Sequence, residues 1–301
     1  MSALADAARS SSLAEHLQAR CTFPTGDVPI HCAVSGGADS TALAILATRA
    51  GRQPVLWHVD HGLRDGGDAE ADAVVRLAES LGTRAECRRV TVGHGPNLEA
   101  RARAARYAVL PDGVLTGHTL DDHAETVLIN LLRGAGLTGL TGIKRPATRP
   151  LLCIRRSETR ALCASLGVSV LDDPMNEDSR FIRARVRAEV LPLLNDVSGR
   201  DIAALLARQA TLMRDDDDLL DELAKFIDPT DATALRRAPV AIARRAIRSW
   251  LAHPYPPDSA CVERVLDVAR GERTACDVGG SREVRRSQNR LSVEKTRHVV
   301  G

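Results

Sequence analysis

The first half of the chain alternates short apolar runs with helical patterns, and this alternation limits the folds open to it. Each apolar run has the length of a buried strand, and each helical segment is long enough to cross back over a sheet. The expected strands are residues 29–34, 54–60, 85–92, 113–117 and 149–154, and the expected helices are 39–50, 68–81, one opening at Asn97, 119–133 and 157–167. Repeated strand–helix–strand units indicate an α/β fold with a doubly wound, mainly parallel sheet. Ligands bind such sheets at the carboxyl ends of the strands.

The second half of the chain loses this alternation and becomes mostly helical. Long helices are expected over 200–227, 232–252 and 258–271, and short strands around turns are expected in the tail. The 301 residues are 44% hydrophobic, which is enough apolar material for two ordinary cores. We therefore predict two domains, 1–205 and 206–301, joined by a helix. The four aspartates at 215–218 are interpreted as a solvated helix face.

Composition and termini exclude several classes of protein. The formal net charge is +2, so any nucleic-acid surface has to be a local patch. The seven cysteines include no CxxC pair, so we expect no disulfide framework, zinc site or iron–sulfur site. The first twenty residues lack the charged start and apolar run of a signal peptide, and no apolar run reaches about 18 residues. The expected location is the cytoplasm.

The segment after the first expected strand has the form of an anion-binding turn. Ser35, Gly36 and Gly37 lead directly into a helix, where backbone N–H groups and the helix N-terminus favour a phosphate. A lysine does not follow the last glycine, so this is not a Walker A loop. A tight turn by itself would also account for the glycines. Asp39 adds information, because a carboxylate beside a phosphate needs an intervening cation, which suggests Mg²⁺.

The segment "SGGADS" (35–40) is similar to the SGGxDS signature of the PP-loop ATP pyrophosphatases, also called N-type, which have an adenine nucleotide alpha hydrolase-like fold. The resemblance implies that ATP is cleaved between its α- and β-phosphates and that an oxygen of the substrate is adenylated. It assigns ATP binding to the whole segment and a catalytic role to Asp39, which is also the candidate Mg²⁺ ligand. The implied ATP-binding residues here are Ser35, Gly36, Gly37, Ala38, Asp39 and Ser40.

Further segments, in order along the chain, resemble the tRNA(Ile)-lysidine synthase family in a short form with one helical C-terminal domain. They are "HVDHGLR" (58–64), "NLEARARAARY" (97–107), "LTGHTLDDHAETVLINLLRGAG" (115–136) and "DDPMNEDSRFIRARVRAEVLPLL" (172–194). The resemblance implies an ATP-dependent ligase. The wobble cytidine of an isoleucine tRNA with a CAU anticodon is adenylated on its carbon-2 oxygen, and free lysine then displaces AMP to give lysidine. The codon read changes from AUG to AUA. A homodimer is among the expected assemblies of such a short form.

The proposed nucleophile needs a proton acceptor. A lysine ε-amine has an unperturbed pKa of about 10.4, so its neutral form costs roughly 4.6 kcal/mol at pH 7. Asp122 and Glu125 are three residues apart and share a helix face near a strand's carboxyl end. We assign both to the lysine amine, with Asp122 as the better catalytic base. The alternative is that Asp121 and Asp122 only complement a helix N-terminus.

Three other polar residues are expected beside the nucleotide. The resemblance places Asp60 and His61 there, and His118 is a candidate contact of the phosphates or ribose. The spacing of His58, Asp60 and His61 also suits a metal, but no further ligand cluster accompanies them.

Basic residues supply the candidate tRNA contacts. Arg183 and Arg187 lie one helical turn apart, so together they suit a phosphate or the carboxylate of lysine. The full set of candidates is Arg101, Arg106, Lys144, Arg145, Arg183 and Arg187.

Three alternative functions are open to a chain with this loop: two other ATP-dependent enzymes and one non-catalytic binding module. A tRNA thiolase normally needs cysteine pairs, which are absent here. A small-molecule amide synthetase would not need the arginine-rich second domain. A non-catalytic nucleotide- or RNA-binding module would not need Asp39 together with Asp122 and Glu125.

Overall fold

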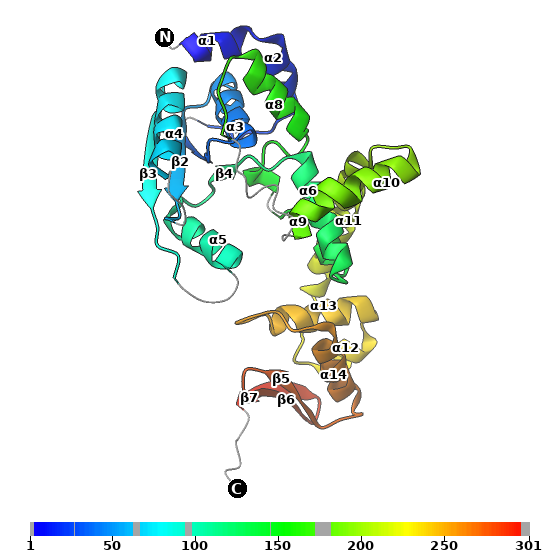
Figure 1. The fold of residues 1–301 in the computed structure, drawn as a ribbon. Helices are drawn as coiled ribbons and strands as arrows, with labels where there is room; N and C mark the ends of the chain where they lie inside the picture. The colour runs from blue at the N-terminus through cyan, green and yellow to red at the C-terminus, as the bar shows by residue number, and fades with distance from the viewer. Residues whose placement is uncertain are drawn as a thin grey trace. The chain divides into compact units, whose positions relative to one another are not determined.

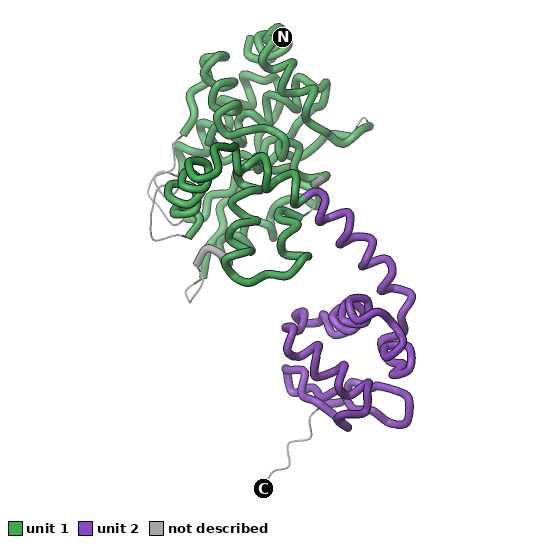
Figure 2. The backbone as a smooth tube through the Cα atoms, turned by 90° about the vertical axis from the view of Figure 1, so that its right-hand side faces the viewer, with its two compact units in different colours: residues 1–210 green, residues 211–301 purple. Residues whose placement is uncertain are grey.

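A computed structural model describes residues 3–26, 28–62, 67–93, 98–144, 146–171 and 182–295. The chain divides into two compact units, Met1–Ala210 and Thr211–Gly301 (Figure 2). Both this division and the boundary expected after residue 205 lie within one helix, α11 (Ile202–Ala224). Each unit has its own cluster of buried apolar side chains. Within the described ranges, no helix is long and apolar enough to cross a membrane.

The first unit is built on a parallel sheet of four strands in the order β3-β2-β1-β4 (Figure 1). The strands are β1 (Ile30–Ala33), β2 (Pro54–Asp60), β3 (Arg84–Arg89) and β4 (Leu115–Thr116). The prediction of a mainly parallel α/β sheet is confirmed. The chain runs outward from β1 to β3 and then returns to the other side of β1. The strand order therefore reverses between β1 and β4, where open parallel sheets bind their ligands.

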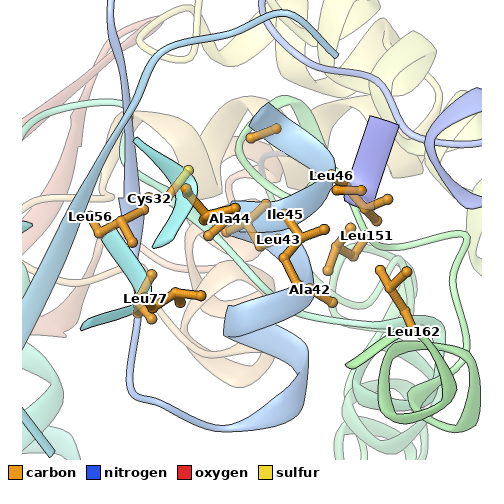
Figure 3. Packing of buried hydrophobic residues seen from close by; sticks show 14 of the residues in the cluster. Cys32, Ala42, Leu43, Ala44, Ile45, Leu46, Leu56, Leu77, Leu151 and Leu162 are labelled. Carbon is orange, nitrogen blue, oxygen red and sulfur yellow. The ribbon is translucent and has the colours of Figure 1, made fainter. Parts of the chain in front are cut away.

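Helices make up most of the rest of the first unit. They are α1 (Ala3–Ser10), α2 (Ser12–Ala19), α3 (Ala38–Arg49), α4 (Gly67–Leu81), α5 (Leu98–Val109), α6 (Leu120–Leu132), α7 (Leu137–Leu140), α8 (Arg156–Ser165), α9 (Ile182–Arg185) and α10 (Leu191–Ser198), with a 3₁₀ turn at Pro146–Thr148 and a π-helical turn at Val186–Val190. Helix α3 packs against β1, β2, α1, α2 and α8. Residues 40–47 of α3 are all buried. Figure 3 shows the apolar part of this stretch, from Ala42 to Leu46, packed in the core with Leu56, Leu77, Leu151 and Leu162.

The strand expected over residues 149–154 is wrong, because this segment forms a turn. The N–H of Ile154 donates to the carbonyl of Leu151 at 2.9 Å, which closes the turn. Both side chains are fully buried in the core around α3. Residues three apart would point to opposite faces of a strand, whereas a turn buries both on one side.

The second unit combines helices with a small antiparallel sheet. Its elements are the remainder of α11, then α12 (Ala232–Arg237), α13 (Val240–Trp250), α14 (Ser259–Arg270), β5 (Ala275–Gly279), β6 (Arg282–Ser287) and β7 (Arg290–Lys295). The short strands expected in the tail are confirmed. The single helix expected over 232–252 is wrong, because Pro239 divides it. Ala238, before this proline, has an extended ψ of 148°, as the proline ring requires.

The aspartate run on α11 is only partly a solvated face. Asp215, Asp216 and Asp218 are exposed, but Asp217 is 5% exposed. Its carboxylate accepts a hydrogen bond from Arg245 of α13, which also reaches Asp221 on the next turn of α11. The run therefore includes a buried ion pair that holds two helices of the second unit together.

Candidate active site

The loop after β1 presents a row of backbone N–H groups at the start of α3. Gly37 is the N-cap and supplies no side-chain acceptor. Among the described residues, the N–H groups of 36–40 have no hydrogen-bond acceptor; the first such bond runs from Thr41 to the carbonyl of Gly37. Gly36 has φ +84°, a conformation that other residues rarely adopt. The row of free donors at a helix N-terminus is a site for a phosphate.

Hydroxyl groups hold this loop in shape. Ser40 Oγ accepts from the N–H of Ser35 at 3.1 Å and donates to the carbonyl of Gly37 at 3.0 Å. The two serine hydroxyl oxygens lie 3.3 Å apart. The structure thus places the predicted ATP segment as one connected loop, with Ser35 and Ser40 bracing its ends.

The end of β4 lies directly against the first turn of α3. A Cβ atom on Gly117 would stand 2.6 Å from the carbonyl oxygen of Asp39 and 2.9 Å from the nitrogen of Ser40. Only a glycine allows this approach of two backbones. It brings the start of α6, which follows β4, next to the phosphate loop at the point where the strand order reverses.

The two carboxylate oxygens of Asp122 have different hydrogen-bond partners. One oxygen, Oδ2, accepts from the N–H of Thr119 at 2.8 Å and from its hydroxyl at 2.9 Å, which completes a capping box at the start of α6. The other oxygen, Oδ1, accepts from Arg156 at 2.8 Å and from Arg183 at 3.2 Å. The capping alternative is therefore correct for one oxygen, and the second oxygen belongs to the site.

Arg156, at the start of α8, joins three carboxylates. Its guanidinium lies 2.8 Å from Asp122, 3.1 Å from Glu125 and 3.5 Å from Asp39. Arg183 and Arg187 add hydrogen bonds of 2.8 Å each to Glu125, whose side chain is 0% exposed. We call this set the carboxylate–arginine cluster; its members are Asp39, Asp122, Glu125, Arg156, Arg183 and Arg187.

The cluster shifts the acidity of its carboxylates in opposite directions. Burial by itself would raise the pKa of Asp122, but the charges of Arg156 and Arg183 and the N–H of Thr119 lower it below its usual range. Burial raises the pKa of Asp39, and the nearby charge of Asp122 adds to this. The hydroxyl of Thr159 and the guanidinium of Arg156 oppose the rise without cancelling it. Asp39 is thus a buried carboxylate whose negative charge is only partly offset by its neighbours.

Asp39 fits a magnesium ion shared with a nucleotide. Mg²⁺ in phosphate-transfer sites is commonly held by one or two carboxylates, substrate phosphate oxygens and water. Asp39 follows the free N–H groups of the loop, is 26% exposed at its side chain and has a raised pKa. The donor set and the missing positive charge both suit the ion that the sequence suggests.

Arg156 and Thr159 were missed in the sequence. Thr159 is fully buried and donates its hydroxyl hydrogen bond to Asp39 Oδ1 across 120 positions of the chain. Asp121 holds α8 in place, since its carboxylate accepts from the N–H of Arg156 at 2.7 Å and from the guanidinium of Arg155. The pair of arginines just after a buried turn was the available signal, but nothing local shows which residues they reach.

A second group of arginines surrounds Tyr107 on α5. Arg106 and Arg103 place their guanidiniums 5.4 and 5.0 Å from the centre of its ring, and Arg149 donates to its hydroxyl at 3.0 Å. Arg149 is 8% exposed, and burial lowers its pKa. The Nε atoms of Arg101, Arg106 and Arg149 are buried without a hydrogen-bond acceptor among the described residues. Unmatched buried positive charge of this kind suits an anionic ligand.

His118 lies close to both groups of charges. Its Nδ1 is 2.6 Å from the hydroxyl of Thr116. Burial lowers the pKa of His118 to about 4, and Arg149 and Arg183 contribute, whereas Asp122 opposes the shift. The ring is therefore neutral at physiological pH, so it can exchange hydrogen bonds with a ligand without adding charge.

The other predicted site residues are Asp60, His61, Lys144 and Arg145. Asp60 accepts from the N–H of Gly62 at 2.8 Å and from Arg89 at 2.7 Å, and these bonds lower its pKa; both contacts are local to the end of β2, next to His61. Lys144 is exposed after α7. Arg145 lies outside the described residues, as do Asn97 and Arg180.

Two family models match the chain. The PP-loop domain model matches residues 10–194, and the TilS substrate binding domain model matches residues 231–292. The first covers every member of the carboxylate–arginine cluster, and the second lies within the second compact unit.

Curated proteins and a solved structure are also similar. A tRNA(Ile)-lysidine synthase of Nocardia farcinica is 40% identical over 308 residues, which covers 94% of this chain and 95% of that protein. One from Rhodococcus erythropolis is 45% identical over 235 residues, covering 73% of this chain and 72% of that protein. The U34-tRNA thiolase NcsA of Methanococcus maripaludis superposes with a TM-score of 0.52 at 18% identity, covering 67% of this chain and 78% of that one. At that identity the similarity concerns the fold alone.

Proposed function

Because the chain belongs to the tRNA(Ile)-lysidine synthase family of PP-loop enzymes, we propose that it uses ATP to attach lysine to carbon 2 of the wobble cytidine in the CAU-anticodon isoleucine tRNA. The observation that carries this proposal is the carboxylate–arginine cluster. A single guanidinium, that of Arg156, connects Asp39 at the phosphate loop with Asp122 and Glu125 on α6. Two chemical steps, adenylation and displacement by an amine, therefore share one small site.

The loop after β1 would bind ATP. The free N–H groups of residues 36–40 suit phosphate oxygens, and Asp39 would hold Mg²⁺ against them. Mg²⁺ held there would offset phosphate charge during attack on the α-phosphorus. Thr159 and Arg156 fix the orientation of the Asp39 carboxylate. A correctly aimed carboxylate is needed because misplacement by about 1 Å costs roughly a hundredfold in rate.

Adenylation converts the cytosine oxygen into a leaving group. The carbon-2 oxygen forms a bond to the α-phosphorus, and the bond from that phosphorus to the β-phosphate oxygen breaks and releases pyrophosphate. Negative charge gathers on the phosphoryl oxygens during this step. We infer that Arg106 and Arg149 around Tyr107, whose Nε atoms have no acceptor among the described residues, offset such charge. Neutral His118 would offer a hydrogen bond.

Lysine then attacks carbon 2, and AMP leaves. We propose that the ammonium of lysine binds between Asp122 and Glu125 and that Asp122 takes its proton. Asp122 Oδ1 accepts hydrogen bonds from Arg156 and Arg183, which makes it a weak base. A guanidinium that gives up this oxygen to the incoming ammonium would restore the basicity of Asp122. The exposed side of Arg183, at 38%, leaves room for that exchange.

The tRNA would contact basic side chains outside the cluster. Lys144 is exposed close behind α7, and Arg145 follows it. Phosphate contacts of this type weaken as salt rises. We expect Lys144→Ala to raise the KM for tRNA a few fold and to reduce the salt dependence of binding by about one ion.

A homodimer remains a prediction, and one feature of α11 supports it. Exposed apolar side chains recur at intervals of seven and four residues, as on a helix that pairs with another helix. They are Leu212, Leu219 and Leu223, and the exposed Phe226 follows just after the helix ends. Sedimentation equilibrium on the full chain, compared with Leu219→Glu, measures whether this stripe joins two copies.

The decisive experiment is transfer of radiolabelled lysine to a CAU-anticodon isoleucine tRNA transcript with ATP and Mg²⁺. We expect label to appear in a modified cytidine, with one AMP released for each lysine, and none without ATP. A methionine tRNA with the same anticodon serves as the matched control. Transfer of sulfur in place of lysine would identify a thiolase, and AMP formation on a small amide acceptor would identify an amide synthetase.

The variant Asp122→Asn tests the proposed role of Asp122 as a base separately from its role in the capping box of α6. Asparagine keeps an oxygen for the N–H of Thr119, so α6 should still begin normally. We expect tRNA binding to persist and lysine transfer to stop. Normal turnover of this variant would exclude Asp122 as the base.

A further inference from the structure

Two cysteines from distant parts of the chain meet beside the active site. Cys21 follows α2, and Cys153 lies in the buried turn at 150–154. Cys153 Sγ donates to the carbonyl of Arg20, the residue before Cys21, at 2.6 Å, and Cys21 Sγ donates to the carbonyl of Leu17 at 3.3 Å. Residue 153 therefore lies against the chain next to Cys21. Both cysteines are free and neither is fully buried, so a small reagent can reach them.

The surroundings of the pair favour a reactive thiolate. The neighbouring Cys21 and the charge of Arg20 lower the pKa of Cys153 to about 7, against the opposing effect of burial. The neighbouring Cys153 and burial raise the pKa of Cys21, which stays protonated. Arg20 is held in place by Glu158 at 2.5 Å and by the carbonyl of Cys153. The thiolate is the nucleophilic form of cysteine, and a neighbouring thiol is the usual resolving partner.

The turn that carries Cys153 also holds the start of both active-site helices. The carbonyl of Ile154 accepts from the N–H of Leu120, the first residue of α6, at 2.9 Å. The next residue, Arg155, is the N-cap of α8 and binds Asp121. Arg156 and Asp122 therefore stand within three residues of groups fixed by this turn. A displacement of the turn reaches the carboxylate–arginine cluster directly.

We propose that Cys21 and Cys153 form a reversible intramolecular disulfide on exposure to a hydroperoxide, and that this disulfide slows the reaction at the neighbouring site. The Cys153 thiolate attacks the peroxide, so a sulfur–oxygen bond forms, the oxygen–oxygen bond breaks and water leaves after protonation. The thiol of Cys21 then attacks the sulfenic acid and releases a second water as the sulfur–sulfur bond forms. In sum, two thiols and one hydrogen peroxide give one disulfide and two waters.

Bond formation changes the contacts of the turn. A disulfide sulfur carries no hydrogen, so Cys153 would lose the bond that it donates to the carbonyl of Arg20. The sulfurs would be joined at about 2.05 Å, and the same turn fixes the N-termini of α6 and α8. Formation of the disulfide is independent of the proposed function, whereas its effect on turnover rests on that function.

The test is treatment of the full chain with hydrogen peroxide, followed by alkylation, non-reducing digestion and peptide mass mapping. We expect a cross-linked peptide pair containing Cys21 and Cys153, and a roughly tenfold fall in lysine transfer that dithiothreitol reverses. Earlier oxidation of the exposed Cys87, or absence of the cross-link, would overturn the proposal. If the untreated protein transfers no lysine, the proposed function fails, and the cross-link still decides the disulfide.

Matched variants separate this disulfide from general oxidation. Cys87→Ser should behave as the parent protein does, since its thiol lies on β3, outside the pair. Cys21→Ser should give no cross-link and should leave a sulfenic acid on Cys153 that dimedone captures. Cys153→Ser should resist reversible inactivation. Equal, dithiothreitol-reversible inactivation of Cys21→Ser would contradict a disulfide switch.

Discussion

Arginine side chains bind carboxylates in both units of the molecule, but the positive and negative charges are matched less evenly in the first unit than in the second. In the second unit, Arg245 binds Asp217 and Asp221, which lie one turn apart on α11, and the contact joins α11 to α13. In the first unit, the carboxylate–arginine cluster gathers side chains from α3, α6, α8 and the α9 region. The Arg245 contact links two adjacent helices of the second unit, whereas the carboxylate–arginine cluster concentrates charge at the end of the parallel sheet in the first unit.

This difference separates charged pairs that stabilise the fold from charged groups that the fold does not require. In the cluster, Glu125 is bonded to three guanidiniums while Asp39 keeps a raised pKa. A fold gains little from such an uneven distribution, since each unmatched buried charge costs free energy. Perturbed groups gathered at a ligand-binding edge are typical of active sites. The Arg245 pair, by contrast, has the properties of a structural contact.

The largest expected effect is on Asp39. Asn in place of Asp39 keeps its size and its bond to Thr159 but removes the charge that we propose binds Mg²⁺. We expect pyrophosphate release to fall at least about a thousandfold, equivalent to roughly 4 kcal/mol of activation free energy. The measurement is pyrophosphate release with tRNA and saturating ATP. A rate within tenfold of the parent protein would remove Asp39 from the adenylation step.

Asp217 should affect stability and leave the chemistry intact. Asp217→Asn leaves Arg245 partly buried without its main partner, and breaking such a pair costs about 3 kcal/mol. Urea unfolding of the full chain measures the loss, and Asp216→Asn, at an exposed position of the same run, is the control. Lysine transfer by the folded fraction should stay normal. Equal stability of the two variants would remove the distinction between the two arrangements.

Arg156 should affect both half-reactions. We expect Arg156→Gln to lower kcat/KM for lysine transfer about a hundredfold, or roughly 2.7 kcal/mol. Loss of this charge raises the pKa of Asp122, so the acidic limb of the pH–rate profile should move to higher pH. Arg156→Lys should recover part of the rate. Arg160→Gln, at an exposed position of the same helix, is the control; a similar loss there would indicate a general effect on α8.

His118 should make the protein sensitive to acid. Its folded pKa, about 4, is below the unfolded value of about 6.5, so unfolding takes up a proton between these values. Stability is therefore complete above pH 6.5 and falls as pH drops toward 4. We expect His118→Gln to lose up to about 2 kcal/mol less than the parent protein between pH 7 and 5. Parallel pH curves for the two proteins would show that His118 is not buried in its neutral form.

Local patterns predicted much of the fold. The strands at β1 and β2 were found to within one or two residues, because each is apolar and bounded by turn residues. The segment at 149–154 was misassigned because a short apolar run does not distinguish a buried strand from a buried turn. The helix expected over 232–252 failed at Pro239, whose effect on its neighbours outweighed the helical periodicity on both sides.

The sequence by itself determined the glycine loop, the alternation of strands and helices and the helical spacing of Asp122 and Glu125, since all of these depend on neighbours in the chain. The tertiary structure alone decided which charges meet. Arg156 and Thr159 reach Asp39 from more than a hundred positions away. The structure places Arg183 against Asp122 and Glu125, although phosphate or lysine was its expected partner. The physical reason is that Coulomb interactions depend on distance and burial in space and not on separation along the chain.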